Sequence, residues 1–193
     1  MILSFRQESP TMQTFRIFFL ILCCISSAVT VHAEQTCKTN SIPASTPDSQ
    51  LIDNGDGTIT DSKTGLMWKK CLEGVAGDTC NNGSPSAFTW QQALQRPGTV
   101  NSGEGFAGYT DWRLPNVREL ISIVEEQCYK PAINLKRFPN TPVSSLWSAS
   151  LYAPNASEAW IIAFENGNPG NKERNVNSSS GAPLAVRLVR GGQ

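Results

Sequence analysis

The chain has 193 residues, and its 16 Lys and Arg residues balance its 16 Asp and Glu residues. This neutrality argues against a general nucleic-acid-binding protein, because such a protein carries a basic excess. The only histidine is His32, in a segment that we expect to be removed, which would exclude His-dependent catalysis and His-ligated metals from the mature protein.

Residues 1–33 are predicted to be a signal peptide. A basic residue precedes an apolar run over residues 17–25, and small residues then lead to a favourable cleavage site after Ala33. The signal peptide is predicted to start at either Met1 or Met12. The apolar run is shorter than the roughly 20 residues that a membrane helix needs. We therefore expect a secreted or periplasmic protein with no membrane span after signal cleavage.

Four cysteines remain after the predicted cleavage: Cys37, Cys71, Cys80 and Cys128. An even number in an exported chain favours two disulfides, and four cysteines allow three pairings. Cys71 and Cys80 enclose a short Gly-containing segment, which favours a Cys71–Cys80 bond across a hairpin. A Cys37–Cys128 bond follows by elimination. Zinc is disfavoured because no Cys-x-x-Cys pair occurs, and we expect no bound metal and no cofactor.

The first predicted elements follow a polar segment. Residues 34–50 are rich in Ser, Thr and Pro and are expected to form an extended N-terminal lead-in held at its cysteine. Short alternating runs then predict strands at 51–52, 58–60 and 66–68, with a Thr-Gly turn before the last one. Residues 71–87 are predicted to be a loop.

The stretch DNGDGT at residues 53–58 resembles a calcium loop. An EF-hand loop carries Asp at its first position and Glu at its twelfth. When Gly57 is aligned with the loop glycine, those positions hold Ile52 and Lys63. Asn-Gly and Asp-Gly are also strong hairpin-turn dipeptides. We therefore predict a β-turn rather than a calcium site.

Two capping boxes predict two helices. In the first, Thr89 is the N-cap, and the helix is expected to end at about Gln95, before Pro97. In the second, Asn116 is the N-cap and Glu119 lies three residues on. The apolar residues of this second helix are spaced to form one helical face: Val117, Leu120, Ile121 and Val124.

The C-terminal part is predicted to be mostly strand. Apolar runs predict strands over 145–150 and 159–164, with a turn at 165–167. Residues 167–181 are polar and are expected to be a flexible loop, and 184–189 is the last predicted strand. Early helices with strands at both ends indicate an α+β domain whose termini are paired in one antiparallel sheet.

A series of motifs resembles one family. These are NGDGTITDSKTGLMW (54–68), the Trp-Gln-x-Ala-Leu helix start (90–94), GYTDWRLPNVREL (108–120), LWSAS (146–150), AWIIAF (159–164) and VRLVR (186–190). In this order they resemble the Lcl carboxy-terminal domain family, named after a bacterial collagen-like adhesin, over roughly residues 51–190. The Asp-Trp-Arg-Leu-Pro block is the most specific part.

The resemblance implies a C-type-lectin-like fold, which also houses formylglycine-generating enzymes. Two helices would pack on an antiparallel sheet with long loops, in a domain over residues 51–193. Most family members are exported bacterial proteins of unknown role, and the namesake adhesin domain is associated with sulfated glycosaminoglycans. Fold analogy alone does not carry that activity to this chain.

Catalysis is not expected. The formylglycine-generating enzymes use cysteines near the end of the domain, whereas none follows Cys128 here, and the calcium-binding motifs of sugar-binding C-type lectins are absent. No pair of carboxylates is brought together by sequence spacing. Asp111 and Arg113 are expected to form a structural ion pair or to bond nearby backbone. Core packing rather than sugar stacking is expected for the tryptophans Trp68, Trp90, Trp112, Trp147 and Trp160.

The polar segment 168–179 is the candidate recognition loop, because loops on a rigid scaffold often carry binding. An ordinary solvated hairpin loop is the alternative. The sequence predicts an exported non-catalytic binding module for a glycan or a cell-surface protein. The first alternative is a structural subunit of an envelope or surface assembly, and the second is a carboxylate-dependent enzyme. The candidate ligand-binding residues are Lys172, Arg174, Asn175 and Asn177, with Tyr152 and Asn155 in another loop.

Overall fold

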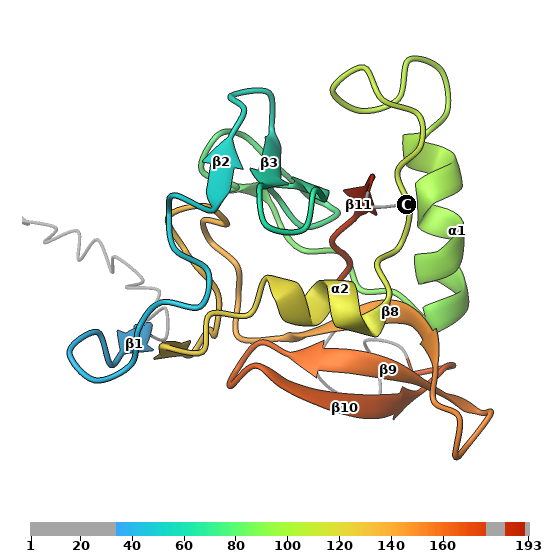
Figure 1. Cartoon of the computed structure of the whole chain (residues 1–193). Helices are drawn as coiled ribbons and strands as arrows, with labels where there is room; N and C mark the ends of the chain where they lie inside the picture. The colour runs from blue at the N-terminus through green and yellow to red at the C-terminus, as the bar shows by residue number, and fades with distance from the viewer. Residues whose placement is uncertain (1–33, 177–183, 192–193) are drawn as a thin grey trace, which may run out of the picture. The chain divides into compact units, whose positions relative to one another are not determined.

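The computed structural model describes residues 34–176 and 184–191. In these ranges two helices accompany several antiparallel sheets (Figure 1), so the predicted α+β class is confirmed. The predicted signal peptide and Asn177 lie outside the described residues. Neither helix in the described ranges has the length and apolar character that a membrane crossing requires.

A four-stranded antiparallel sheet holds both ends of the predicted domain, in the order β11-β4-β3-β2. Ile59 pairs with Trp68, which in turn pairs with Val189 of the last strand. The expectation of one sheet for both termini is therefore confirmed, but the terminal strands β2 and β11 do not pair with each other, because β3 and β4 lie between them. The strands of this sheet are β2 (Leu51–Asp53), β3 (Thr58–Asp61), β4 (Met67–Lys69) and β11 (Val189–Arg190).

The DNGDGT stretch connects β2 to β3 as predicted. The Gly55 N–H donates to Asp53 Oδ1 at 3.0 Å, and the Thr58 N–H donates to Asp56 Oδ1 at 3.0 Å. Asp53 Oδ2 also lies 2.7 Å from Lys70 Nζ. Both aspartates therefore bond groups of the protein itself, as Asp side chains in turns commonly do.

A three-stranded antiparallel sheet forms a second layer, in the order β10-β9-β8 (Figure 1). Its strands are β8 (Ser145–Leu151), β9 (Glu158–Ala163) and β10 (Asn168–Glu173). The first two confirm the prediction. The expected loop at 167–181 is wrong over β10, because every residue of β10 has a partner in β9. The side chains of β10 are mostly exposed, so polar residues are tolerated there, and its backbone hydrogen bonds are formed with β9. Gly167 permits the preceding turn, since its φ is +79° and an added Cβ would lie 2.5 Å from Val124.

The segment 184–189 was predicted as one strand, but it divides its bonds between the two sheets. The Trp147 N–H donates to Ala185 O at 3.1 Å, whereas the Lys69 N–H donates to Leu188 O at 3.0 Å. Only Val189–Arg190 is paired as strand β11. The single-strand prediction is therefore wrong for residues 184–188, because this segment crosses from one sheet to the other.

Helix α1 (Trp90–Val100) begins at the predicted capping box and continues past Pro97. The Thr89 N–H donates to Gln92 Oε1 at 2.8 Å, and the Gln92 N–H donates to Thr89 Oγ1 at 3.2 Å. The predicted end before Pro97 is wrong. The proline removes only its own N–H donor, while its carbonyl still accepts a bond from the Asn101 N–H at 2.8 Å.

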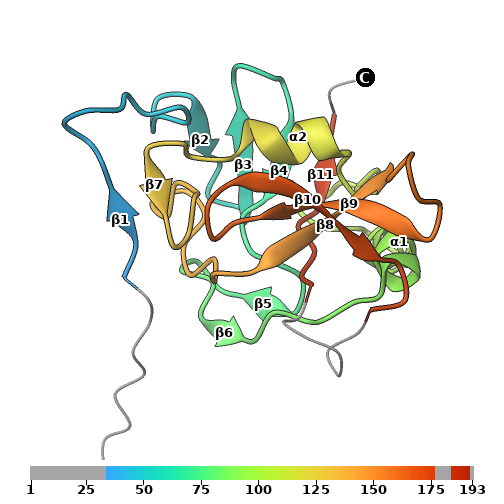
Figure 2. The same cartoon turned by 90° about the horizontal axis from the view of Figure 1, so that it is seen from below.

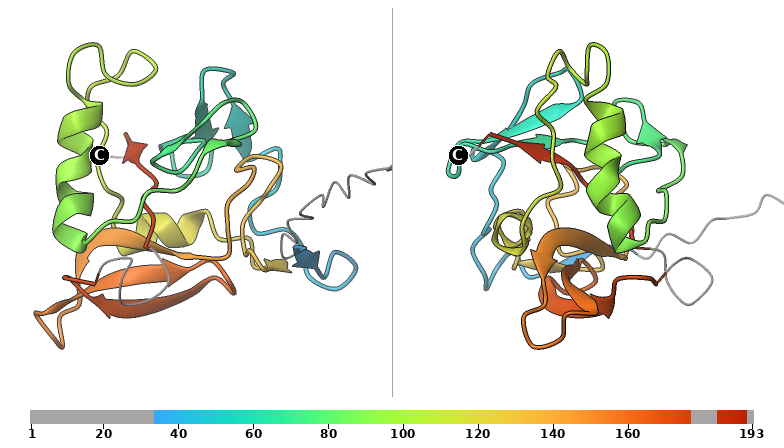
Figure 3. Two further views of the ribbon diagram at one scale, coloured as in Figure 1. Left: turned by 180° about the vertical axis from the view of Figure 1, so that it is seen from behind. Right: turned by 90° about the vertical axis from the view of Figure 1, so that its right-hand side faces the viewer.

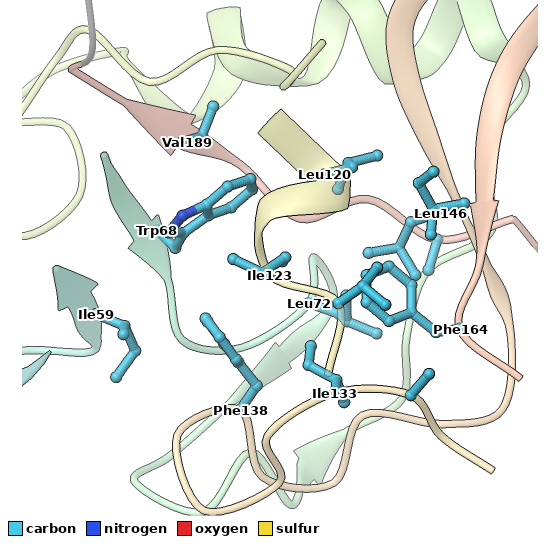
Figure 4. Packing of buried hydrophobic residues seen from close by; sticks show 14 of the residues in the cluster. Ile59, Trp68, Leu72, Leu120, Ile123, Ile133, Phe138, Leu146, Phe164 and Val189 are labelled. Atoms are coloured by element: carbon cyan, nitrogen blue, oxygen red, sulfur yellow. The ribbon is translucent and has the colours of Figure 1, made fainter. Parts of the chain in front are cut away.

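Helix α2 (Val117–Ser122) begins at the second predicted capping box. Asn116 Oδ1 accepts from the Glu119 N–H at 2.9 Å, and Glu119 Oε2 accepts from the Asn116 N–H at 2.8 Å. The helix is shorter than the apolar spacing predicted, because Val124 lies beyond its end and forms a β-bridge with Ile133. Leu120 still points into the core (Figure 4).

The main core lies where α2 meets both sheets (Figure 4). Trp68, Phe138 and Phe164 are fully buried there, together with Leu146 from β8. A second cluster surrounds Trp112 and Trp147. The expectation of core packing is thus confirmed for the three tryptophans at 68, 112 and 147. The other two, Trp90 and Trp160, are only partly buried.

Arg187 is buried in the middle of the domain, with 1% of its surface exposed. Its guanidinium donates to the carbonyls of Lys69 and Lys70 and to Thr141 Oγ1. Its Cζ lies 4.6 Å from the centre of the Phe138 ring. Burial lowers the pKa of Arg187 to about 9. This side chain ties the end of β4 and the segment around Thr141 to the residues before β11.

The lead-in, residues 34–50, is a folded strap rather than a simple extended segment. We call it the strap. It begins with β1 (Thr36–Cys37), which pairs with β7 (Cys128–Tyr129) beside the predicted Cys37–Cys128 disulfide. Further along, Glu125 accepts the N–H groups of Ser45 and Thr46 at 2.9 Å each. Figure 2 shows the strap on the opposite side of the domain from α1.

The predicted Cys71–Cys80 bond is also present, with an S–S distance of 2.03 Å. The expected loop at 71–87 contains a small hairpin of β5 (Val75–Ala76) and β6 (Asn82–Gly83), and the bond joins Cys71, which precedes β5, to Cys80 in the turn between the two strands. Gly74 fits this hairpin against its second half, since an added Cβ would lie 2.6 Å from Ser84 O. We call residues 71–80 the disulfide loop.

Candidate functional site

A groove of about 410 Å³ lies between the N-terminal end of α1 and the residues that follow β10. We call it the α1 groove. In Figure 3 this end of α1 lies beside β8. The lining combines a hydroxyl, two amides, an indole, a leucine and a guanidinium. The lining residues are Thr89, Trp90, Gln91, Leu94, Arg174 and Asn175.

Backbone bonds place Arg174 against the start of α1. The Arg174 N–H donates to Ser157 O at 3.0 Å, in the turn between β8 and β9. The Arg174 carbonyl accepts from the Trp90 N–H at 2.9 Å. The first turn of a helix leaves backbone N–H groups without helical partners, so Arg174 satisfies one of them. Both walls of the groove are therefore joined through the backbone.

The Trp90 side chain is held from two sides. Its indole Nε1–H donates to Ser148 O at 2.8 Å, and Ser148 lies in a bulged part of β8. The guanidinium carbon of Arg174 lies 5.4 Å from the centre of the Trp90 ring. A cation over an indole face is attracted by the ring quadrupole. Arg174 therefore contacts a fixed aromatic surface while it lines the groove.

The structure brings together only some of the predicted ligand-binding residues. Arg174 and Asn175 line the α1 groove. Lys172 is exposed on β10, opposite Ala159. Tyr152 packs edge-on against Trp160, with ring centres 4.9 Å apart, and Asn155 accepts the Ser157 N–H at 3.1 Å within the β8–β9 turn.

Sequence reasoning missed Trp90, Gln91 and Leu94 as groove residues. Trp90 was expected to pack in the core, yet it is only partly buried. The capping box contained a usable signal, because it places Trp90 at the first helical position and Leu94 one turn later. Leu94 is 41% exposed, so its side chain is accessible to a ligand in the groove.

A second, smaller groove of about 320 Å³ lies beside α2. Its lining includes Arg118 and Glu119 together with Thr64 and Leu66. Glu119 is already engaged, since both of its oxygens accept bonds from the Arg113 guanidinium at 2.6–2.7 Å. Burial raises the pKa of the Glu119 carboxyl, but Arg113 and the Asn116 N–H outweigh burial and hold this pKa below its ordinary value.

Asp111 and Arg113 do not pair with each other. Asp111 Oδ1 lies 2.6 Å from Arg190 Nε, and Arg113 bonds Glu119 instead. The hydrogen bond from Arg190 holds the pKa of the Asp111 carboxyl below its usual value. The expected Asp111–Arg113 ion pair is therefore wrong, although each side chain pairs with another residue and Arg113 also bonds the Gly191 carbonyl, the expected kind of backbone bond. The reason is that the Arg113 backbone bridges to Val189, which brings Arg190 beside Asp111.

The α1 groove has binding chemistry but no acid–base pair. No carboxylate is among its lining residues in the described part of the chain. Across residues 34–176 and 184–191, no cluster of His, Cys, Asp and Glu could hold a metal ion. A guanidinium, two amides and a hydroxyl can donate hydrogen bonds, and Leu94 and Trp90 can contact apolar surface. The groove is therefore suited to holding a ligand.

We compared the chain with curated proteins and with models of protein families. No curated protein matches this chain. The family model of the Lcl C-terminal domain matches residues 57–190, which is more than half of the chain. The matched region contains both helices and all the strands except β1, which lies in the strap, and β2. The protein belongs to the Lcl C-terminal domain family.

Proposed function

We propose that this protein is an exported, non-catalytic binding module that recognises a glycan carrying anionic groups. The observation that carries the proposal is the convergence of Arg174 and Asn175 with Trp90, Gln91 and Leu94 in the α1 groove. Two disulfides support an oxidising compartment, either periplasmic or extracellular. We also propose that the α+β arrangement is of the C-type-lectin-like kind.

The chemistry of Arg174 favours an oxyanion. A guanidinium presents a planar fork of N–H donors that matches a carboxylate or a sulfate. The Arg174 Cζ lies 5.4 Å from the centre of the Trp90 ring, and a cation–π contact of this kind does not use up the N–H donors. No carboxylate of the described residues lies within ion-pair distance of Arg174. A ligand anion is therefore a suitable partner.

The remaining lining suits a sugar ring. The side chains of Gln91 and Asn175 are exposed amides that can bond hydroxyl groups. Leu94 offers an apolar contact for the C–H face of a pyranose. Such a groove would bind one or two rings of a chain, with the anionic group directed at Arg174.

The experiment compares three matched oligosaccharides by isothermal titration calorimetry with the purified protein: tetragalacturonate, neutral galactotetraose and its sulfated form. Arg174→Gln should weaken binding of an anionic tetramer about tenfold, since it removes a charge-assisted hydrogen bond. Lys172→Gln is the control, because Lys172 is an exposed cation two residues away that does not line the groove.

The preferred anion identifies whether the site reads a carboxylate or a sulfate. Equal loss of affinity in the Lys172 and Arg174 variants would instead mean that diffuse surface charge, not the groove, attracts the ligand. Absence of binding to all three tetramers, together with capture of a stable protein partner, would overturn the glycan proposal in favour of a surface assembly.

A further inference from the structure

Glu73 is a buried carboxylate outside the α1 groove, and only 1% of its surface is exposed. It lies inside the disulfide loop, two residues after Cys71. Its Oε1 lies 2.6 Å from Lys69 Nζ, and its Oε2 lies 2.7 Å from Arg96 Nε. A buried charge of this kind requires partners. Both oxygens of Glu73 are thus satisfied by cations from two different elements.

The backbone of Glu73 adds two further bonds. Its N–H donates to Val186 O at 2.9 Å, and its carbonyl accepts from the Ser86 N–H at 2.9 Å. The side chain of Lys69 is in turn held over the Phe106 ring, 4.2 Å from its centre. Glu73 is therefore fixed in place before its contact with α1 is considered.

Helix α1 contacts the second core cluster through three residues, Trp90, Ala93 and Val100. Ala93 is the one residue of this helix that is buried. The first turn is held through Trp90, and the C-cap Asn101 exchanges bonds with the backbone of Trp112 at 2.7 and 2.9 Å. Between these ends, Arg96 forms an ion pair with Glu73. The groove residue Leu94 lies between the Trp90 and Arg96 attachments, so both determine where it sits.

We propose that Glu73 is a positioning residue for the α1 groove: held by the Cys71–Cys80 loop, it fixes α1 through Arg96 and so sets the geometry in which Leu94 and Trp90 meet a ligand. This inference rests on the proposed function of the groove. It assigns to the disulfide loop a role in ligand affinity, although no residue of the loop lines the groove.

The first test does not involve a ligand. Glu73→Gln keeps the size of the side chain but removes the charge that Lys69 and Arg96 share. Amide hydrogen exchange over residues 94–100 should become about tenfold faster, because local opening depends on the interactions that hold the segment. Exchange in the strap should stay unchanged. Unchanged exchange in α1, or equal acceleration in both segments, would overturn the inference.

The second test measures affinity for whichever tetramer binds best. Glu73→Gln and Arg96→Gln should each weaken binding about tenfold, and the double variant should be no weaker than either single one, because the two residues act as a pair. Additive losses would show that Glu73 acts on the groove by another route. Arg96→Lys should restore part of the affinity.

The two disulfides provide a matched comparison. Replacing Cys71 and Cys80 with Ser should weaken tetramer binding, whereas replacing Cys37 and Cys128 should leave it unchanged. The reverse order of effects would contradict the proposed role of the disulfide loop. If no tetramer binds even the unaltered protein, the proposed function fails, but the exchange experiment still decides whether Glu73 positions α1.

Discussion

The strap end and the groove end of this domain are built in different ways. At the strap end, residues 34–50 are held by a disulfide, a strand pair and a buried carboxylate. At the groove end, α1 has a single buried residue and the lining side chains are exposed or only partly buried. The strap end therefore has the contacts that stabilise a fold, and the groove end has the accessible surface that binding needs.

This difference separates stability from binding along the chain. Exposed side chains contribute little to stability, so they are free to be selected for ligand contact. The strap lies outside the matched family region, residues 57–190, yet it bonds residues 124–134 within it. We therefore expect changes in the strap to alter the free energy of unfolding, and changes in the groove to alter affinity.

The largest effect should come from the Cys37–Cys128 bond. It closes 91 residues, and the chain-entropy model gives such a bond about 4–5 kcal/mol. The Cys71–Cys80 bond closes 9 residues, for which the same model gives about 2–3 kcal/mol. Urea unfolding of one variant with Cys37 and Cys128 replaced by Ser, and of another with Cys71 and Cys80 replaced by Ser, compares the two losses of unfolding free energy. Equal losses would mean that the disulfide at the strap end stabilises the fold no more than the Cys71–Cys80 bond does.

The sequence predicted the features that are local or covalent, and these occur at both ends of the domain. Both disulfides followed from the number and spacing of the cysteines. The capping boxes at Thr89 and Asn116 were readable because each involves residues three apart. The ends of the helices were harder. Pro97 signals a stop, but tertiary contacts such as Asn101 with Trp112 carry α1 beyond it.

The groove could be predicted only in part because it is made by distant segments. Arg174 and Asn175 stood out as polar residues in a supposed loop, but their neighbours on α1 are 80 or more positions away in the chain. The Trp90–Arg174 bond depends on how β10 ends, and β10 itself was not predicted. Likewise, the role of Glu125 depends on strap residues about 80 positions earlier.

The second prediction concerns Glu125, which is 3% exposed. Burial raises the pKa of its carboxyl, but the N–H groups of Ser45, Thr46 and Gln127 outweigh burial and hold this pKa below its ordinary value. Glu125→Gln should cost about 2 kcal/mol, because it weakens hydrogen bonds to a charged group. The exposed neighbour Glu126 supplies the matched control, Glu126→Gln.

The same carboxyl predicts a pH dependence at the strap end. A carboxyl whose pKa is lowered by folding stabilises the protein above its ordinary pKa, near 4.5, and loses that contribution as the pH falls through its folded value. Urea unfolding between neutral and acidic pH should therefore show a smaller acid-induced loss in Glu125→Gln than in the unaltered protein. Equal losses would place the acid sensitivity elsewhere.

The third prediction tests whether the groove end is free of stability constraints. Leu94→Ser should lower stability by at most about 0.5 kcal/mol, because the side chain is already 41% exposed. It should still weaken tetramer binding several-fold through loss of apolar contact. Leu151→Ser is the matched control, since Leu151 is 51% exposed and lies outside the groove lining. A large loss of stability would show that α1 depends on Leu94.

The smallest effect is expected at the Asp111–Arg190 pair, which shows what an exposed ion pair contributes in comparison with the buried, hydrogen-bonded carboxylate of Glu125 at the strap end. The Asp111 side chain is 57% exposed, so solvent screens its attraction to Arg190 and Asp111→Asn should cost no more than about 0.5 kcal/mol. The pKa of Asp111 is lowered, chiefly by the hydrogen bond from Arg190, so this small contribution is fully present above the ordinary pKa of 3.8 and is lost as the pH falls through the lower folded value. In 1 M salt, the difference in urea midpoint between Asp111→Asn and the unaltered protein should largely disappear. The difference caused by Glu125→Gln should remain, because buried bonds are screened much less. A Glu125 contribution that also vanished in salt would mean that the strap is held by surface charge rather than by buried hydrogen bonds.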